Sequence, residues 1–242
     1  MYLCTFYRYG IIIIMNIEKY HQIQSQLPDS TRLIAVSKTK PVEDIQMLYD
    51  EGQRLFGENK AQEMKSKHEV LPQDIQWHFI GHLQTNKIKY IAPYVAMIHS
   101  IDSESLLVEV NKLAAKNQRV IPCLLQFHIA QETTKFGFTL EECREMLQGE
   151  VFPTLHNVKI CGVMGMATFT EDMEQVRQEF RHLHDIFQTL KTDFFADHED
   201  FKEISMGMTD DYPIAIEEGS TFIRVGSAIF GVRNYQTTAI SH

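Results

Sequence analysis

The amino-acid sequence predicts a single-domain α/β protein with the (β/α)8 or TIM barrel architecture, in which eight parallel strands close into a ring and helices connect them. Short apolar runs alternate along the chain with segments whose apolar residues recur at helical spacing. The chain has 242 residues, a common length for one α/β barrel, and shows no Ser-, Gly- or Pro-rich linker and no internal repeat. A doubly wound open sheet is the alternative, but eight regular strand–helix units in about 200 residues favour a closed barrel over an open sheet.

The expected strands are short apolar runs bounded by polar or turn residues. The first, Leu-Ile-Ala-Val-Ser, has the continuous apolar character of a strand buried on both faces of a parallel sheet, and Pro41 marks the turn after it. The eight expected strands are residues 33–37, 54–57, 77–81, 97–101, 120–127, 159–164, 202–205 and 221–225.

The expected helices carry apolar residues on one face. Residues 42–51 show this spacing at Val42, Ile45 and Leu48, and Gly52 is a natural helix end. The longest helix, residues 171–191, has an apolar stripe that we expect to pack on the core: Met173, Val176, Phe180, Leu183, Phe187 and Leu190. The remaining expected helices are residues 17–26, 59–70, 85–91, 103–117, 140–147 and 213–218, with a final segment starting near residue 227.

The composition excludes several functional classes. Lys and Arg number 23 against 32 Asp and Glu, giving a net charge of −9, whereas a general nucleic-acid binder carries a basic face. The four cysteines show no C-x-x-C spacing, which suggests neither a zinc site nor a disulfide framework and fits a reducing cytosol. We therefore expect a cytoplasmic protein that binds neither nucleic acid nor membrane.

The first 14 residues differ from the rest of the chain. They are apolar and aromatic, contain Arg8 and Gly10, and are too short to span a bilayer. They also lack the leading charge and the small-residue cleavage site of a secretory signal. Because the residues after Met15 look like an ordinary cytosolic start, we expect residues 1–14 to be a non-native or disordered extension. Residues 15–235 are then expected to form the barrel and residues 236–242 a tail.

Lys38 follows the first expected strand, and chemistry in this fold gathers where the strands end. An ammonium group in apolar surroundings is costly unless it has a partner or a task. Such surroundings lower the pKa of the amine, and the free base is the nucleophile that forms a Schiff base with a carbonyl. The ordinary alternative is a lysine that extends from the strand end to water.

Small residues follow the last two strands, where barrels commonly bind phosphate. Ser205, Gly207 and Thr209 come after the seventh strand, and Gly226 and Ser227 come after the eighth, before a helical turn whose dipole favours an anion. With Lys38 across the barrel mouth, these loops suggest a ligand that has a phosphate at one end and a carbonyl at the other.

Two further patterns have competing interpretations. Arg224 lies between the apolar Ile223 and Val225, so it needs either a fixed acceptor at the site or a salt bridge to a neighbouring strand. His78 and His82 have i, i+4 spacing, but an expected strand end lies between them, so the helical geometry of a zinc site is missing. We expect no metal site.

Residues 77–87, Trp-His-Phe-Ile-Gly-His-Leu-Gln-Thr-Asn-Lys, resemble the signature of the pyridoxal phosphate homeostasis proteins. These are single-domain relatives of the alanine racemase N-terminal barrel. The resemblance extends from about residue 15 to residue 233, and further matching segments occur in the same order. They are residues 35–40, 56–59, 135–137, 205–208 and 224–227.

The resemblance implies a fold-type III barrel that holds pyridoxal 5′-phosphate (PLP) as a Schiff base on Lys38. The phosphate would be bound by Ser205, Gly226 and Ser227, and Arg224 would face the pyridine nitrogen. Asn59 and His78 would lie near the cofactor, with Met206 and Gly207 beside the phosphate loop. The implied cofactor-binding residues are Lys38, Asn59, His78, Ser205, Met206, Gly207, Arg224, Gly226 and Ser227.

The chain departs from the family pattern after the fifth strand. Relatives usually read Gln-Val-Asn there, where this chain has Gln126, Phe127 and His128. An imidazole in place of an amide could change what occupies that side of the site.

The implied function is intracellular PLP homeostasis: the protein would bind the cofactor reversibly, buffer or deliver it, and so influence amino-acid and keto-acid metabolism. The alternative is a PLP-dependent amino-acid racemase. Racemases of this type add a β-domain and take a second base from a partner subunit, and only about ten residues follow Gly231 here. We therefore expect a non-catalytic monomer whose partners are PLP and the apoenzymes that receive it. Lys40, expected in the same strand phase as Lys38, could take the Schiff base if Lys38 were removed.

Overall fold

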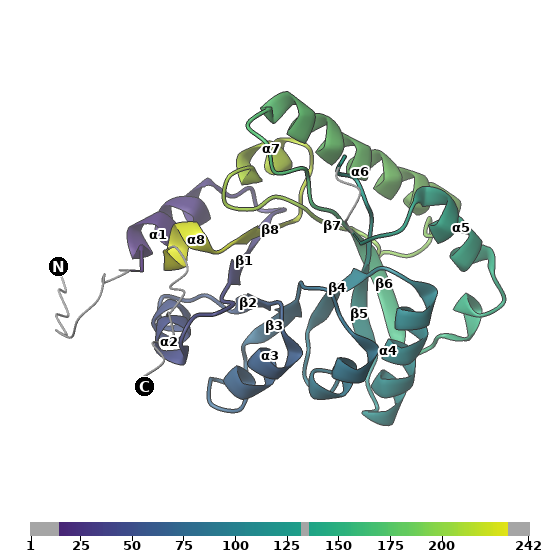
Figure 1. Cartoon of the computed structure of the whole chain (residues 1–242), viewed down its shortest axis with the longest axis horizontal. Coiled ribbons are helices and arrows are strands. Elements are labelled where there is room, and N and C mark those ends of the chain that lie inside the picture. The colour runs from purple at the N-terminus through teal and green to yellow at the C-terminus, as the bar shows by residue number, and fades with distance from the viewer. Residues whose placement is uncertain (1–14, 132–135, 232–242) are drawn as a thin grey trace, which may run out of the picture.

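The structure, a computed structural model, describes residues 15–131 and 136–231, which form a closed barrel of eight strands in chain order. Neighbouring strands are parallel throughout, including β8 and β1, which close the ring. Figure 1 shows the helices arranged around the strands. The barrel predicted from the sequence is confirmed, whereas the expected extension (1–14) and tail (236–242) lie outside the described residues.

The strands begin and end close to the expected positions. Their bounds are β1 Arg32–Val36, β2 Leu55–Glu58, β3 Gln76–Phe79, β4 Met97–Ile101, β5 Ile121–Gln126, β6 Val158–Met164, β7 Glu203–Ser205 and β8 Phe222–Val225. One small shift matters for the site. Because β1 ends at Val36, Lys38 and Lys40 lie in a turn beyond the strand, and the expectation that they share a strand phase is wrong.

The α-helices are α1 Ile17–Gln26, α2 Val42–Asp50, α3 Ala61–His68, α4 Glu104–Lys116, α5 Leu140–Gln148, α6 Met173–Asp193, α7 Tyr212–Glu217 and α8 Ser227–Phe230. Two segments of the described residues are 3-10 helices: η1 Thr85–Tyr90, expected as a short helix, and η2 Phe152–Thr154, which was not expected. Helix α3 starts later than predicted because Lys60 is extended, with φ −126° and ψ 122°. The stripe on α6 is buried as expected, except that Met173, the first residue of the helix, is 40% exposed.

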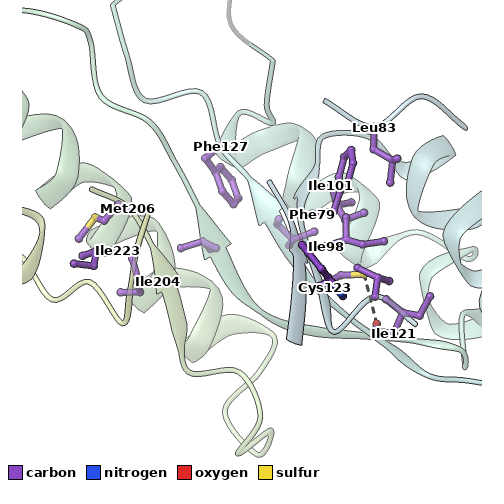
Figure 2. Packing of buried hydrophobic residues seen from close by; sticks show 14 of the residues in the cluster. Phe79, Leu83, Ile98, Ile101, Ile121, Cys123, Phe127, Ile204, Met206 and Ile223 are labelled. Carbon is purple, nitrogen blue, oxygen red and sulfur yellow. Dashed lines mark hydrogen bonds between the residues drawn. The ribbon is translucent and has the colours of Figure 1, made fainter. Parts of the chain in front are cut away.

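The main core lies between the barrel and its helices. Figure 2 shows part of this layer, including Ile204 from β7, Met206 just after it and Ile223 from β8. A smaller cluster contains Ile34, Leu124, Cys161 and Phe222, which alternate along their strands with residues of the main core. Because successive strand residues point to opposite faces, this smaller cluster fills the barrel interior.

The same alternation places polar side chains inside the barrel. On β3, Trp77 and Phe79 belong to the outer core, so His78 between them faces inward. On β8, Arg224 lies between Ile223 and Val225 of the outer core and also faces inward. His78 and Arg224, two of the nine residues expected to bind a cofactor, therefore share the barrel interior.

Within the described ranges, no helix combines the length and apolar character needed to cross a bilayer. The same residues contain no group of three His, Cys, Asp or Glu side chains that could hold a metal ion.

Candidate functional site

A cavity of about 520 Å³ opens where the strands end. Five of the sequence-predicted residues line it: Lys38, Asn59, Arg224, Gly226 and Ser227. Nine further residues complete the lining: Val36, Lys40, Ile80, Met166, Phe169, Met208, Thr209, Asp210 and Gly231. A volume of this size suits a small organic ligand, and a mostly apolar wall with a few polar groups is typical of cofactor sites.

Lys38 reaches the cavity from the turn that follows β1. The amide of Lys40 donates to the carbonyl of Ser37 at 3.0 Å, which closes this turn, and Thr39 within it has a positive φ of 65°. The side chain of Lys40 takes a different course, because its ammonium donates to the carbonyls of Phe230 (2.7 Å) and Gly231 (3.1 Å). Burial lowers the pKa of Lys40.

The first turn of α8 forms another side of the cavity. Gly226 precedes the helix and Ser227 begins it, so the first backbone N–H groups of α8 have no carbonyl partner within the helix. The Ser227 hydroxyl donates to Thr209 Oγ1 at 3.2 Å, which joins the loops after β7 and β8. Close approach favours glycine at position 226, because a Cβ there would lie 3.0 Å from the carbonyl oxygen of Val36, a tight contact.

Arg224 is 5% exposed and has fixed acceptors. Its Nη1 donates to the Ser205 hydroxyl at 2.6 Å, and its Nη2 donates to the Gly165 carbonyl at 3.0 Å. Burial lowers the pKa of Arg224 to about 10, so the guanidinium remains charged at neutral pH. Of the two interpretations of this residue, a fixed acceptor at the site is the one that the geometry shows.

A chain of hydrogen bonds leads from Arg224 across the barrel interior. The Ser205 hydroxyl lies 2.9 Å from His99 Nδ1, and His99 Nε2 lies 2.8 Å from His78 Nδ1. Burial lowers the pKa of His78 to about 3, and burial, with the nearby His78 and Arg224, also lowers that of His99. The sequence prediction did not include His99, although a histidine followed by a serine inside the short strand Met-Ile-His-Ser-Ile was a signal of a buried polar network.

The other four predicted residues do not line the cavity. Ser205 and Met206 are fully buried, and His78 is 3% exposed. Gly207 has a positive φ of 91°, and its carbonyl accepts the backbone N–H of Arg224 at 2.9 Å. Their expected roles toward a cofactor stay predictions, whereas Met208, Thr209 and Asp210, from the loop after β7, do line the cavity.

The residues after strand five that depart from the family pattern do not line the cavity either. His128 bonds through its backbone N–H to the Phe138 carbonyl at 3.2 Å, and the Gln126 side chain donates to the Phe136 carbonyl at 2.8 Å. Neither residue lines the cavity.

Comparison with known proteins identifies the family. The family model described as "Alanine racemase, N-terminal domain" matches residues 16–234. The pyridoxal phosphate homeostasis protein of Aquifex aeolicus is 37% identical, over 92% of this chain and 96% of that protein. The protein of the same name from Escherichia coli K12 is 36% identical, over 86% of this chain and 88% of that protein.

Solved structures agree with this result. PipY of Synechococcus elongatus, in a structure with PLP bound, is 34% identical and superposes with a TM-score of 0.80, over 88% of this chain and 99% of that one. Alanine racemase of Clostridium difficile is 11% identical with a TM-score of 0.67, which shows a common fold. The chain belongs to the pyridoxal phosphate homeostasis protein family and has the barrel fold of the alanine racemase N-terminal domain.

Proposed function

We propose that this protein binds PLP in the cavity where the strands end and serves PLP homeostasis by buffering the cofactor or delivering it to PLP-dependent apoenzymes. The observation that carries the proposal is the arrangement of three groups around one cavity: the amine-bearing Lys38, the charged Arg224 and the first turn of α8. PLP was found bound in the structure of the relative PipY.

The lining residues fit each part of this cofactor. Lys38 would hold the aldehyde carbon as a Schiff base, which forms with the loss of one water. The phosphate would be bound by the N–H groups that begin α8 and by the Ser227 and Thr209 hydroxyls. Asn59 Oδ1 is buried and has no hydrogen-bond partner among the described residues, so this wall has an acceptor available for a ligand donor.

The same residues favour storage over turnover. A bound PLP supplies an electron sink, whose strength depends on protonation of its ring nitrogen. A guanidinium only donates hydrogen bonds, so Arg224 at this nitrogen would leave it neutral and the sink weak. Among the described lining residues there is no histidine or tyrosine to act as a second base, and the Lys40 ammonium is bonded to two carbonyls. We therefore infer that the protein does not catalyse racemisation.

The proposal is tested by adding PLP to the purified protein and reducing the complex with borohydride. We expect an absorbance band of the protein-bound Schiff base and, after peptide mapping, a label on Lys38. A label on another residue, or none, would refute the assignment. A chiral assay with common amino acids separates storage from racemisation, because turnover that disappears in Lys38→Ala would establish an enzyme.

Delivery is tested separately, by mixing the loaded protein with a PLP-dependent apoenzyme. We expect the apoenzyme to gain activity while the absorbance band of this protein declines. Comparison with an equal amount of free PLP shows whether the protein changes the rate of transfer.

A further inference from the structure

A buried cluster of charges lies beneath the turn that carries Lys38. Lys67, on α3, is 5% exposed, and its ammonium donates to three acceptors. These are the carbonyl of Ser37 (2.8 Å), Glu58 Oε1 (2.7 Å) and Glu63 Oε1 (2.7 Å). One side chain therefore connects β2, α3 and the residue that immediately precedes Lys38.

Both carboxylates of the cluster also bind the turn directly. The Ser37 hydroxyl donates to Glu58 Oε1 at 2.6 Å, and the backbone N–H of Thr39 donates to Glu63 Oε1 at 2.5 Å. The cluster thus contacts the chain on each side of Lys38. Two anchored neighbours restrict the direction in which the residue between them can point.

The backbone within this turn is held in a costly conformation. Thr39 has a φ of 65°, a region that β-branched residues rarely adopt because the side chain crowds the backbone. Such a conformation persists where the surrounding structure over-determines it. The bond from Thr39 N–H to Glu63 is an interaction of this kind.

The composition of the cluster argues for a role beyond stability. Glu58 is fully buried, burial raises its pKa, and its Oε2 has no partner among the described residues. Two carboxylates share one ammonium, and apolar residues of similar volume often stabilise a fold as well as a buried ion pair does. What apolar residues cannot supply is the set of bonds to the Ser37 and Thr39 backbone.

We propose that Lys67, together with Glu58 and Glu63, is a positioning residue that holds the turn so that the Lys38 amine points into the cofactor cavity. The inference rests on the proposed function, since it assigns the cluster to covalent attachment of PLP at Lys38. None of the three residues lines that cavity.

The test uses two ligands that differ at one carbon. PLP has an aldehyde that can bond to Lys38, whereas pyridoxine 5′-phosphate has an alcohol and binds without a covalent bond. In Lys67→Met we expect PLP affinity to fall by roughly 10- to 100-fold, the scale of a reacting group displaced by about 1 Å. Pyridoxine 5′-phosphate affinity should change less than about twofold.

The matched control is Lys65→Met. Lys65 is an exposed lysine on the same helix whose partner is Glu69, and we expect its loss to leave both affinities unchanged. If Lys67→Met weakens both ligands equally, or neither, the positioning role is refuted. If the wild-type protein binds neither ligand, the proposed function itself fails, so the two failures are distinguishable.

A second pair of variants avoids the risk that Lys67→Met does not fold. The Glu63 side chain is 21% exposed, and in Glu63→Gln the amide oxygen can still accept the Thr39 N–H. We expect Glu63→Gln to retain most of the borohydride-fixed label on Lys38, and Glu63→Met to reduce the rate of labelling about tenfold. Equal labelling rates in the two variants would contradict the proposal.

Discussion

The guanidinium of Arg224 and the hydroxyl of Ser205 lie 2.6 Å apart, and this contact sets the direction of the hydrogen bonds beyond it. Arginine can only donate, so the Ser205 oxygen accepts and its single proton is left for His99 Nδ1. His99 must then carry its own proton on Nε2 and donate it to His78 Nδ1. A charged residue at the cavity thereby fixes the tautomers of two histidines on the opposite strands.

Nitrogen NMR of labelled protein tests this chain of donors. We expect His78 and His99 both to be neutral, protonated at Nε2, and unchanged between pH 8 and pH 5, because burial lowers the pKa of each. The signals can be assigned with His78→Asn and His99→Gln. A proton on Nδ1 of His99 would show that the chain runs in the opposite direction.

Removal of the Ser205 hydroxyl should be costly for the fold. Ser205→Ala leaves the Arg224 guanidinium and His99 Nδ1 with one buried bond fewer each. We expect the free energy of unfolding to fall by roughly 2–3 kcal/mol in urea denaturation. Ser100→Ala is the control: its hydroxyl is also fully buried but bonds to none of the described residues, so the loss should stay below about 1 kcal/mol.

The free energy of unfolding should decrease as the pH is lowered, because His78 stays neutral in the folded protein. Its pKa is about 3 when folded, against an ordinary value of 6.5, so below pH 6.5 the unfolded chain binds a proton that the folded chain does not. From pH 6 to pH 4 this lowers the free energy of unfolding by about 2.5 kcal/mol. Glu58 acts in the opposite sense, because burial raises its pKa and protonation then favours the fold.

The contribution of His78 is isolated by comparing wild type with His78→Asn. The asparagine oxygen can still accept from His99, but it does not titrate. We expect the free energy of unfolding, measured in urea at pH 7, 6, 5 and 4, to decline less steeply with falling pH in the variant. The difference in slope should correspond to about one bound proton. Identical slopes would mean that the buried imidazole does not control this dependence.

The sequence predicts the barrel well and the interior of the site less well, for a physical reason. Apolar runs such as residues 33–36 locate strands because burial on both faces leaves a local pattern. The contact of His99 with Ser205 joins residues 106 apart in sequence and exists only because the barrel closes, so no local pattern reports it. Likewise, Lys40 turns toward α8 because β1 ends at Val36. The periodicity of apolar residues does not locate the end of a strand to within one residue.

The loop after β7 should tolerate no side chain at Gly207. A Cβ there would lie 2.5 Å from the Cβ of Ala215, and the φ of 91° is itself unfavourable for alanine. We expect Gly207→Ala to lower the free energy of unfolding by roughly 2–4 kcal/mol. Gly52→Ala separates the two causes, because Gly52 has a φ of 99° but open space around it, and should cost about 1 kcal/mol.

Lys40 should affect the phosphate end of the cofactor rather than its covalent attachment. The Lys40 ammonium binds the carbonyls of Phe230 and Gly231 at the carboxyl end of α8, where a cation stabilises a helix. We expect Lys40→Met to loosen this short helix and to weaken PLP and pyridoxine 5′-phosphate equally, by roughly 3- to 10-fold. Borohydride should still label Lys38, in contrast to the selective loss of PLP affinity expected for Lys67→Met. The control is Lys60→Met, because Lys60 is exposed and does not line the cavity. A selective loss of PLP affinity in Lys40→Met would instead place Lys40 in the attachment step.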